Sequence, residues 1–150
     1  MKSKLSDNNP IRFRLSKENL IIVDASINGN SVPMILDTGA AATVVSKKAA
    51  QRFALRTAGD DVVGKGAGGD VDLSPVKIDS LEIGSVTHEN FTGMSMDLSQ
   101  ICEKIGNEAD GIVGYDFLSN TKLTIDYPER SLLLEAKAKT LPADPDHCPY

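Results

Sequence analysis

Short runs of alternating apolar and polar residues cover most of this chain, and the pattern predicts a mostly-β fold. Residues 11–15 (IRFRL) alternate as a half-buried strand does. Two apolar runs, residues 20–27 and 32–36, are joined at Asn28-Gly29, a dipeptide that favours a tight β-hairpin. Further strand patterns comprise two short strands around a glycine-rich tip in residues 60–73, the segments 74–84 and 86–96, and a final hairpin in residues 122–136.

Helix-forming residues gather in a few short segments. Residues 46–55 are rich in helix formers and begin with Ser46, a good N-cap. Residues 98–106 end at Gly106, which favours the close of a helix. Residues 115–120 predict one or two helical turns. We therefore expect a sandwich-like or barrel-like β-domain with one or two short helices.

The length of 150 residues fits one domain with tails. We expect a flexible arm over residues 1–10, a folded domain over residues 11–136, and a polar, proline-rich tail over residues 137–150. The net charge is −5, aromatic residues make up 5%, and no basic stripe is present. These features argue against nucleic-acid binding.

The cysteine and histidine positions give no indication of a metal or another cofactor. Cys102 and Cys148 are far apart, and no Cys/His cluster has the spacing of a zinc site, so a disulfide between them stays open. No apolar run is long enough to span a membrane, and residues 1–10 lack the apolar stretch of a signal peptide. This favours a cytoplasmic protein, whereas removal of a leader would fit a periplasmic or membrane-tethered one.

The stretch PMILDTGAAATVVS, residues 33–46, places a carboxylate at the end of an apolar strand. Asp37 follows three apolar residues, Thr38 supplies a hydroxyl that both donates and accepts hydrogen bonds, and Gly39 allows close approach of the backbone. Asp-Thr-Gly is also good turn chemistry. The tripeptide therefore indicates a catalytic site only in a suitable context.

A second glycine-rich stretch, GDDVVGKG at residues 59–66, comes close to the phosphate-binding P-loop pattern. Gly66 stands where that motif needs Ser or Thr to hold magnesium. A P-loop must also open a helix, and the residues that follow have a strand pattern. A hairpin tip or a mobile lid is the better interpretation.

A weak internal repeat supplies the context for Asp37. A hairpin, the segment MILDTG and a helix come first; a hairpin, the segment GIVG and a short helix come later. The Asp-Thr-Gly-Ala element, the glycine-rich tip and DGIVGYDFL, in this order, resemble the retropepsin-like aspartic proteases, particularly their bacterial and cellular branches. The resemblance covers residues 11–136 and implies the acid-protease fold, a closed β-barrel or sandwich subunit.

The resemblance also implies roles for individual residues. Asp37 would be the catalytic aspartate, Thr38 would brace its loop across a symmetry axis, and Gly39 would admit the substrate backbone. Further members of the site would support this loop from its own chain: Ala40, Ile112, Val113 and Gly114. The flap that closes over the substrate would be formed by Gly64, Lys65, Gly66, Ala67, Gly68 and Gly69.

Metal-free peptide hydrolysis uses two carboxyl groups, but this chain holds one Asp-Thr-Gly. One carboxylate activates water and a protonated partner polarises the carbonyl, as is already known for aspartic proteases. The second carboxyl must come from another subunit. The resemblance therefore implies an aspartic endopeptidase that is a homodimer, meets on Asp37 and cleaves peptide or protein substrates. The alternative is a non-catalytic retropepsin-like module for dimerisation or peptide binding.

The chain departs from viral members of the family beside the motif. Viral members usually carry acids where this chain has Ala41 and Ala42, and an arginine where it has Tyr115. Loss of both partners of an ion pair leaves no charge unpaired. Near the second element, we interpret Asp110 as a turn former and Asp116 as an acid in the first turn of a helix.

Overall fold

The computed structural model describes residues 10–66, 69–106 and 109–136. Apart from Pro10, the predicted arm and tail lie outside these ranges, so the predicted domain boundaries stay predictions. The described chain is mostly β, as the sequence predicts, but it has three short helices where we expected one or two. All three lie within the segments 46–55, 98–106 and 115–120, for which the sequence predicts helical turns.

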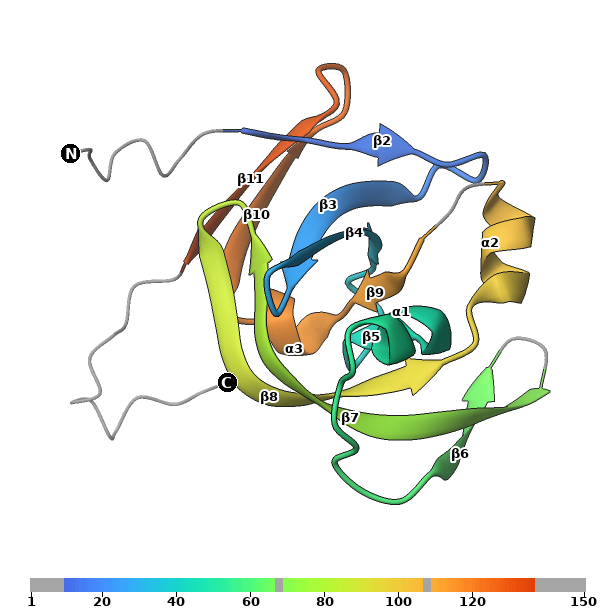
Figure 1. Cartoon of the computed structure of the whole chain (residues 1–150). Helices are drawn as coiled ribbons and strands as arrows, with labels where there is room; N and C mark the ends of the chain where they lie inside the picture. Colours follow the sequence, from blue (N-terminus) through green and yellow to red (C-terminus); the bar gives the residue numbers. More distant parts are fainter. Residues whose placement is uncertain (1–9, 67–68, 107–108, 137–150) are drawn as a thin grey trace, which may run out of the picture.

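Strands and short helices follow one another along the chain (Figure 1). The first half contains β1 (Ile11–Arg12), β2 (Arg14–Leu15), β3 (Ile21–Ile27), β4 (Asn30–Leu36), β5 (Val44–Ser46), α1 (Lys47–Arg52) and β6 (Val62–Gly66). The second half contains β7 (Gly69–Ile83), β8 (Val86–Met96), α2 (Ser99–Ile105), β9 (Gly111–Val113), α3 (Tyr115–Leu118), β10 (Thr121–Asp126) and β11 (Ser131–Ala136).

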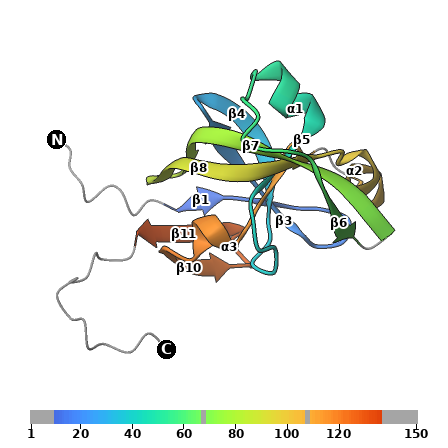
Figure 2. The same cartoon turned by 90° about the horizontal axis from the view of Figure 1, so that it is seen from below.

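The described strands form two sheets. One has the order β1–β11–β10, and the other has the order β2–β3–β4–β9–β5–β8–β7–β6. An additional pairing of β3 with β7 curls the large sheet back on itself, which fits the predicted barrel or sandwich. The small sheet and α3 lie on one side of the molecule, and α1 lies on the opposite side (Figure 2).

The turn between β3 and β4 has the predicted hairpin chemistry. Asn28 and Gly29 both have positive φ, 50° and 86°, as a tight two-residue hairpin requires. The Asn28 Oδ1 also accepts hydrogen bonds from the backbone N–H groups of Asp79 and Ser80, both at 3.0 Å. The predicted hairpin is therefore confirmed, and its turn is attached to β7.

The start of α1 and the end of α2 agree with the sequence signals. The Ser46 hydroxyl accepts the Ala49 N–H at 3.0 Å, and Gly106 closes α2 with a φ of 71°. The expectation of two short strands in residues 60–73 was wrong for the second strand. That strand is the start of the 15-residue β7, which continues through Pro75 because Pro75 still pairs with Met94 of β8.

Apolar side chains are buried on both faces of the sheet around β3 and β4. The inner face contributes Val23 and Met34 to the main core. The outer face contributes Ile22 and Ile35, which pack with Ile105 of α2 in a second, smaller cluster. Both faces are covered here, so residues 32–36, the apolar part of β4 that leads to Asp37, are firmly placed.

Candidate active site

Asp37 lies on the surface directly after the buried end of β4. Leu36 is buried, whereas Asp37 is exposed. The Asp37 N–H donates to the Val113 carbonyl at 3.0 Å, and the Asp37 Oδ1 accepts the Gly39 N–H at 2.9 Å. A firmly held backbone thus presents an exposed carboxylate at the start of the segment 37–43, which we call the Asp37 loop.

The structure brings the two halves of the internal repeat together. Strands β4 and β9 pair in parallel, with Met34 opposite Gly111 and Leu36 opposite Val113. The carboxyl ends of both strands therefore reach the same edge, and residues 113–116 lie directly beside the Asp37 loop. Val113 is fully buried there.

Gly114 packs directly against the main chain of the Asp37 loop. A Cβ at Gly114 would lie 2.6 Å from the Ala42 carbonyl oxygen and 2.8 Å from that of Ala40. The next residue, Tyr115, donates its N–H to the Ala40 carbonyl at 2.7 Å. The position of Gly114 thus leaves no space for a side chain, and Ala40 is held from behind.

Thr38 and Gly39 make few contacts with the described residues of their own chain. Both are exposed, and the Thr38 hydroxyl has no hydrogen-bond partner among the residues that the structure describes. A Cβ at Gly39 would lie 3.4 Å from the Asp37 Oδ1, which is ordinary contact distance. Contacts with the described residues of the same subunit therefore do not require either residue type.

The structure adds a contact at the end of the Asp37 loop that the sequence did not indicate. The Asp116 carboxylate accepts the Thr43 hydroxyl at 2.8 Å and the Thr43 N–H at 3.0 Å. We expected Asp116 to act only as a first-turn acid of a helix, a position that it does occupy. A separation of 73 residues conceals the contact, and only the early-helix acid after the second glycine element could have drawn attention to it.

The predicted flap is the hairpin of β6 and β7, which extends from the body of the molecule (Figure 1). Gly64, Lys65 and Gly66 end β6, Gly69 begins β7, and Ala67 and Gly68 lie outside the described residues. Gly69 has a φ of 117°, which favours glycine. Because β7 follows this tip, the stretch 59–66 does not open a helix as a P-loop would.

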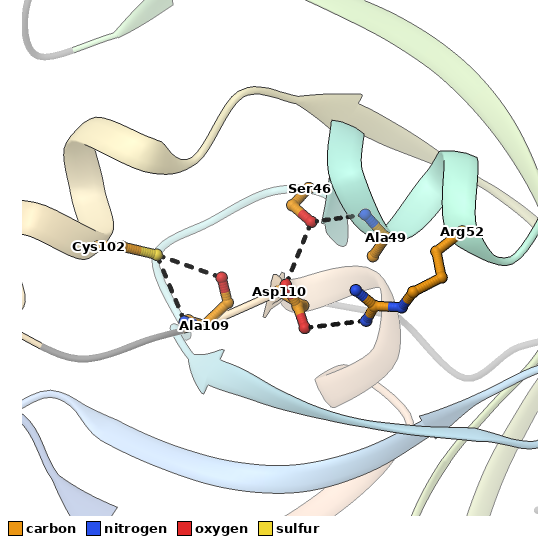
Figure 3. A network of polar contacts seen from close by, with 6 residues as sticks. All are labelled: Ser46, Ala49, Arg52, Cys102, Ala109 and Asp110. Carbon is orange, nitrogen blue, oxygen red and sulfur yellow. Dashed lines mark hydrogen bonds and ion pairs between the residues drawn. The ribbon is translucent and has the colours of Figure 1, made fainter.

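A hollow of about 690 Å³ lies between α1, α2 and the start of β9, at the end of β9 opposite to Val113. Its wall includes Asp110, whose carboxylate accepts the Ser46 hydroxyl at 3.5 Å and pairs with Arg52 at 3.4 Å (Figure 3). The Cys102 thiol lies nearby and contacts the Ala109 backbone. These contacts join α1 and α2 to the residues that precede β9, and they do not involve the Asp37 loop.

The described residues contain no group of three or more His, Cys, Asp or Glu side chains that could hold a metal ion. Within the same ranges, no helix has the length and apolar character needed to cross a membrane.

Solved structures show which class of fold this arrangement defines. A retropepsin-like aspartic protease from Rickettsia conorii has a TM-score of 0.56 and 18% identity, covering 86% of this chain and 90% of its own. The EIAV protease complexed with the inhibitor HBY-793 has a TM-score of 0.51 and 18% identity, covering 68% and 88%. The retroviral protease-like domain of Ddi1 from Leishmania major has a TM-score of 0.50 and 17% identity, covering 79% and 94%. The fold is retropepsin-like, as predicted.

The sequence itself gives the family. A family model described as aspartyl protease matches residues 23–117, which include the Asp37 loop and Asp116. The chain therefore belongs to the aspartyl protease family. A comparison with curated protein sequences finds no match.

Proposed function

We propose that this protein is an aspartic endopeptidase that hydrolyses peptide bonds with water activated between the Asp37 carboxyls of a homodimer. Membership of the aspartyl protease family supports the reaction class. The observation that carries the proposal is an exposed Asp37 carboxylate on a loop whose backbone is held from behind at Val113 and Tyr115. Such a loop is fixed in position yet open to a partner.

The exposed side of the Asp37 loop supports a second copy as that partner. The Thr38 hydroxyl has no hydrogen-bond partner among the described residues of its own chain, so it can bond to a second chain, and Gly39 leaves space for an approaching backbone. Tyr115, next to the loop, is 60% exposed although its ring is large and mostly apolar. A two-fold dimer would place these groups against their own copies.

The chemistry follows from two carboxyls at one site. Two close carboxyls do not both ionise easily, so one retains a proton. The ionised Asp37 would take a proton from water, and the protonated Asp37 would hydrogen-bond the carbonyl oxygen of the scissile bond. The β6–β7 hairpin would close over the peptide and exclude solvent.

The direct test is Asp37→Asn, which retains the shape of the side chain but removes the ionisable carboxyl. We expect cleavage of a peptide library to fall by about 10²–10⁴-fold. Sedimentation and circular dichroism on the same sample check that the variant still folds and assembles like the wild type. Undiminished cleavage by the folded variant would rule out the proposed mechanism.

The same library separates this function from a non-catalytic module. An endopeptidase releases new amino termini, which mass spectrometry identifies along with the cleavage positions. A wild-type protein that assembles and binds library peptides but leaves them intact would instead be a dimerisation or peptide-binding module.

A further inference from the structure

We infer that Asp116 is a positioning residue of this site, and that it acts through Thr43 to fix the end of the Asp37 loop. The inference rests on the proposed function and adds to it a residue that does not touch the substrate. It concerns the geometry of the Asp37 loop within one subunit. It can therefore be tested on the loop itself as well as on catalysis.

The contact between Asp116 and Thr43 uses both carboxylate oxygens. Oδ1 accepts the Thr43 hydroxyl at 2.8 Å and Oδ2 accepts the Thr43 N–H at 3.0 Å. Hydrogen bonds to an ionised acceptor are stronger than neutral ones, and the two-point arrangement also fixes direction. Thr43 is fully buried, so Asp116 supplies hydrogen bonds that water does not readily replace.

Thr43 also connects the carboxylate to the rest of the site. Its Oγ1 accepts the Gly114 N–H at 3.4 Å, and its carbonyl accepts the Met94 N–H of β8 at 3.0 Å. Gly114 in turn lies against the main chain of the Asp37 loop. A shift of Thr43 would therefore be transmitted to the packing behind Asp37.

Residues 113–116 hold the Asp37 loop at its start, middle and end. The start is held by the hydrogen bond from the Asp37 N–H to Val113, and the middle by the one from the Tyr115 N–H to Ala40. Both join backbone to backbone. The end is held at Thr43 by the Asp116 side chain as well as by the backbone hydrogen bond from Met94, so Asp116 is the contact that a side-chain substitution can remove.

Release of the loop end would be costly for catalysis. Without Asp116, the buried N–H and hydroxyl of Thr43 lose their acceptor, and the loop must shift or admit water to satisfy them. Catalytic groups tolerate little displacement, since an error of about 1 Å can reduce a rate by about 10²-fold. Substrate binding, which uses the hairpin as well, would change less.

Asp110 provides a matched control. It is a partly buried carboxylate that immediately precedes the same strand, β9, and it joins separate elements through Ser46 and Arg52 (Figure 3). Its bonds lie at the opposite end of β9 from the Asp37 loop. Asp110→Ala should therefore reduce stability without releasing that loop.

The experiment compares kcat and KM for wild type, Asp116→Ala, Asp116→Asn and Asp110→Ala, at protein concentrations at which each is a folded dimer by sedimentation. We expect Asp116→Ala to lower kcat at least about tenfold with KM within about twofold. Asp116→Asn should lose less, because its amide oxygen still accepts one hydrogen bond. Asp110→Ala should lower the melting temperature with kcat within about twofold.

A second pair tests whether Asp116 acts through Thr43. Thr43→Ser retains the hydroxyl and should retain more activity than Thr43→Val, which loses it. In a double-mutant cycle, Asp116→Ala should cost less in the Thr43→Val background than in wild type, since the contact is already weakened. Equal costs in both backgrounds, or wild-type kcat in folded Asp116→Ala, would overturn the inference.

Amide hydrogen exchange separates this inference from the proposed function. Asp116→Ala should accelerate exchange in residues 37–43, and Asp110→Ala should not. If the wild type cleaves no peptide, the proposed function fails, and the exchange data alone decide whether Asp116 holds the loop. Equal exchange in the two variants would refute the positioning role whatever the activity.

Discussion

Among single residues, Gly39 and Gly114 differ in what surrounds them. A Cβ at Gly114 would meet backbone atoms of Ala40 and Ala42 at less than 3 Å, whereas a Cβ at Gly39 would make one ordinary contact, with Asp37 at 3.4 Å. Gly114 is therefore constrained by its own subunit. The described residues of its own subunit do not constrain Gly39 in this way, whereas the close approach of a substrate or a second subunit would.

Alanine substitution at these two positions should separate folding from activity. We expect Gly114→Ala to lower the free energy of unfolding by about 1–3 kcal/mol, because the loop must move away from the new methyl group. Gly39→Ala should change it by less than about 0.5 kcal/mol and still reduce peptide cleavage at least about tenfold. Urea unfolding and a cleavage assay measure both. Full activity in Gly39→Ala would argue against a close approach at this site.

A local motif draws attention to some of these residues, whereas nothing local draws attention to others. Asp37, Thr38 and Gly39 are contiguous, so a short motif identifies them without any knowledge of the fold. Asp116 lies 73 residues from Thr43, and its local position at the start of α3 already explains an acid there. When the local structure already explains a residue type, the sequence gives no sign that the residue also makes a distant contact.

At the scale of elements, α1 depends on one buried serine. The Ser46 hydroxyl accepts the Ala49 N–H at 3.0 Å and donates to Asp110 at 3.5 Å, so it both caps α1 and connects that helix to the start of β9. The cap is thus part of the contact between α1 and the start of β9. The first of these follows the Asp37 loop, and the second leads into residues 113–116, which support that loop.

Loss of this cap should destabilise the fold but spare the chemistry. Ser46→Ala should lower the free energy of unfolding by about 1–2 kcal/mol, as measured by urea denaturation. Ser31→Ala, at an exposed position of β4, is the control and should change it by less than about 0.5 kcal/mol. An effect of Ser46→Ala no larger than that of Ser31→Ala would show that the cap contributes little.

The elements were predictable where the signal is local. The Asn28-Gly29 hairpin, the start of α1 at Ser46 and the end of α2 at Gly106 follow from turn and cap residues, and each is present. The uninterrupted length of β7 was not predictable, because Pro75 did not break the strand. The parallel pairing of β4 with β9 could not be predicted from the pattern of apolar residues either. Alternation of apolar and polar residues indicates a strand but not the strand beside it.

At the scale of the whole molecule, one chain supplies one of the two carboxyls that the proposed site needs. One described subunit supplies one exposed Asp37 and places it beside the exposed Tyr115. The proposed activity therefore belongs to an assembly and should respond to the composition of that assembly.

Mixing subunits tests this dependence. A roughly ninefold excess of Asp37→Asn protein, allowed to exchange with wild type, should lower wild-type cleavage about tenfold, because most wild-type subunits then face a defective partner. The same excess of an unrelated protein is the control. Unchanged cleavage after complete subunit exchange, verified by mass spectrometry of labelled chains, would show that each subunit works alone.

Acidity should act on the assembly as well. In the proposed mechanism two carboxyls share one proton and lose it as the pH rises, so the rate should decline above neutrality. Values of kcat/KM measured from about pH 3 to about pH 9 would show this limb of the profile. A rate that still increases above neutral pH would contradict a shared proton.

The order in which the chain is synthesised gives the contact between Thr43 and Asp116 another consequence. A growing polypeptide exposes Asp37 early, but the carboxylate that holds its loop is made 73 residues after Thr43. Contacts so distant in sequence form slowly, because a long loop must close first. A nascent chain therefore carries an unsupported aspartate until almost the whole domain has been made. The proposed activity would therefore have to await residues 113–116, which hold the Asp37 loop.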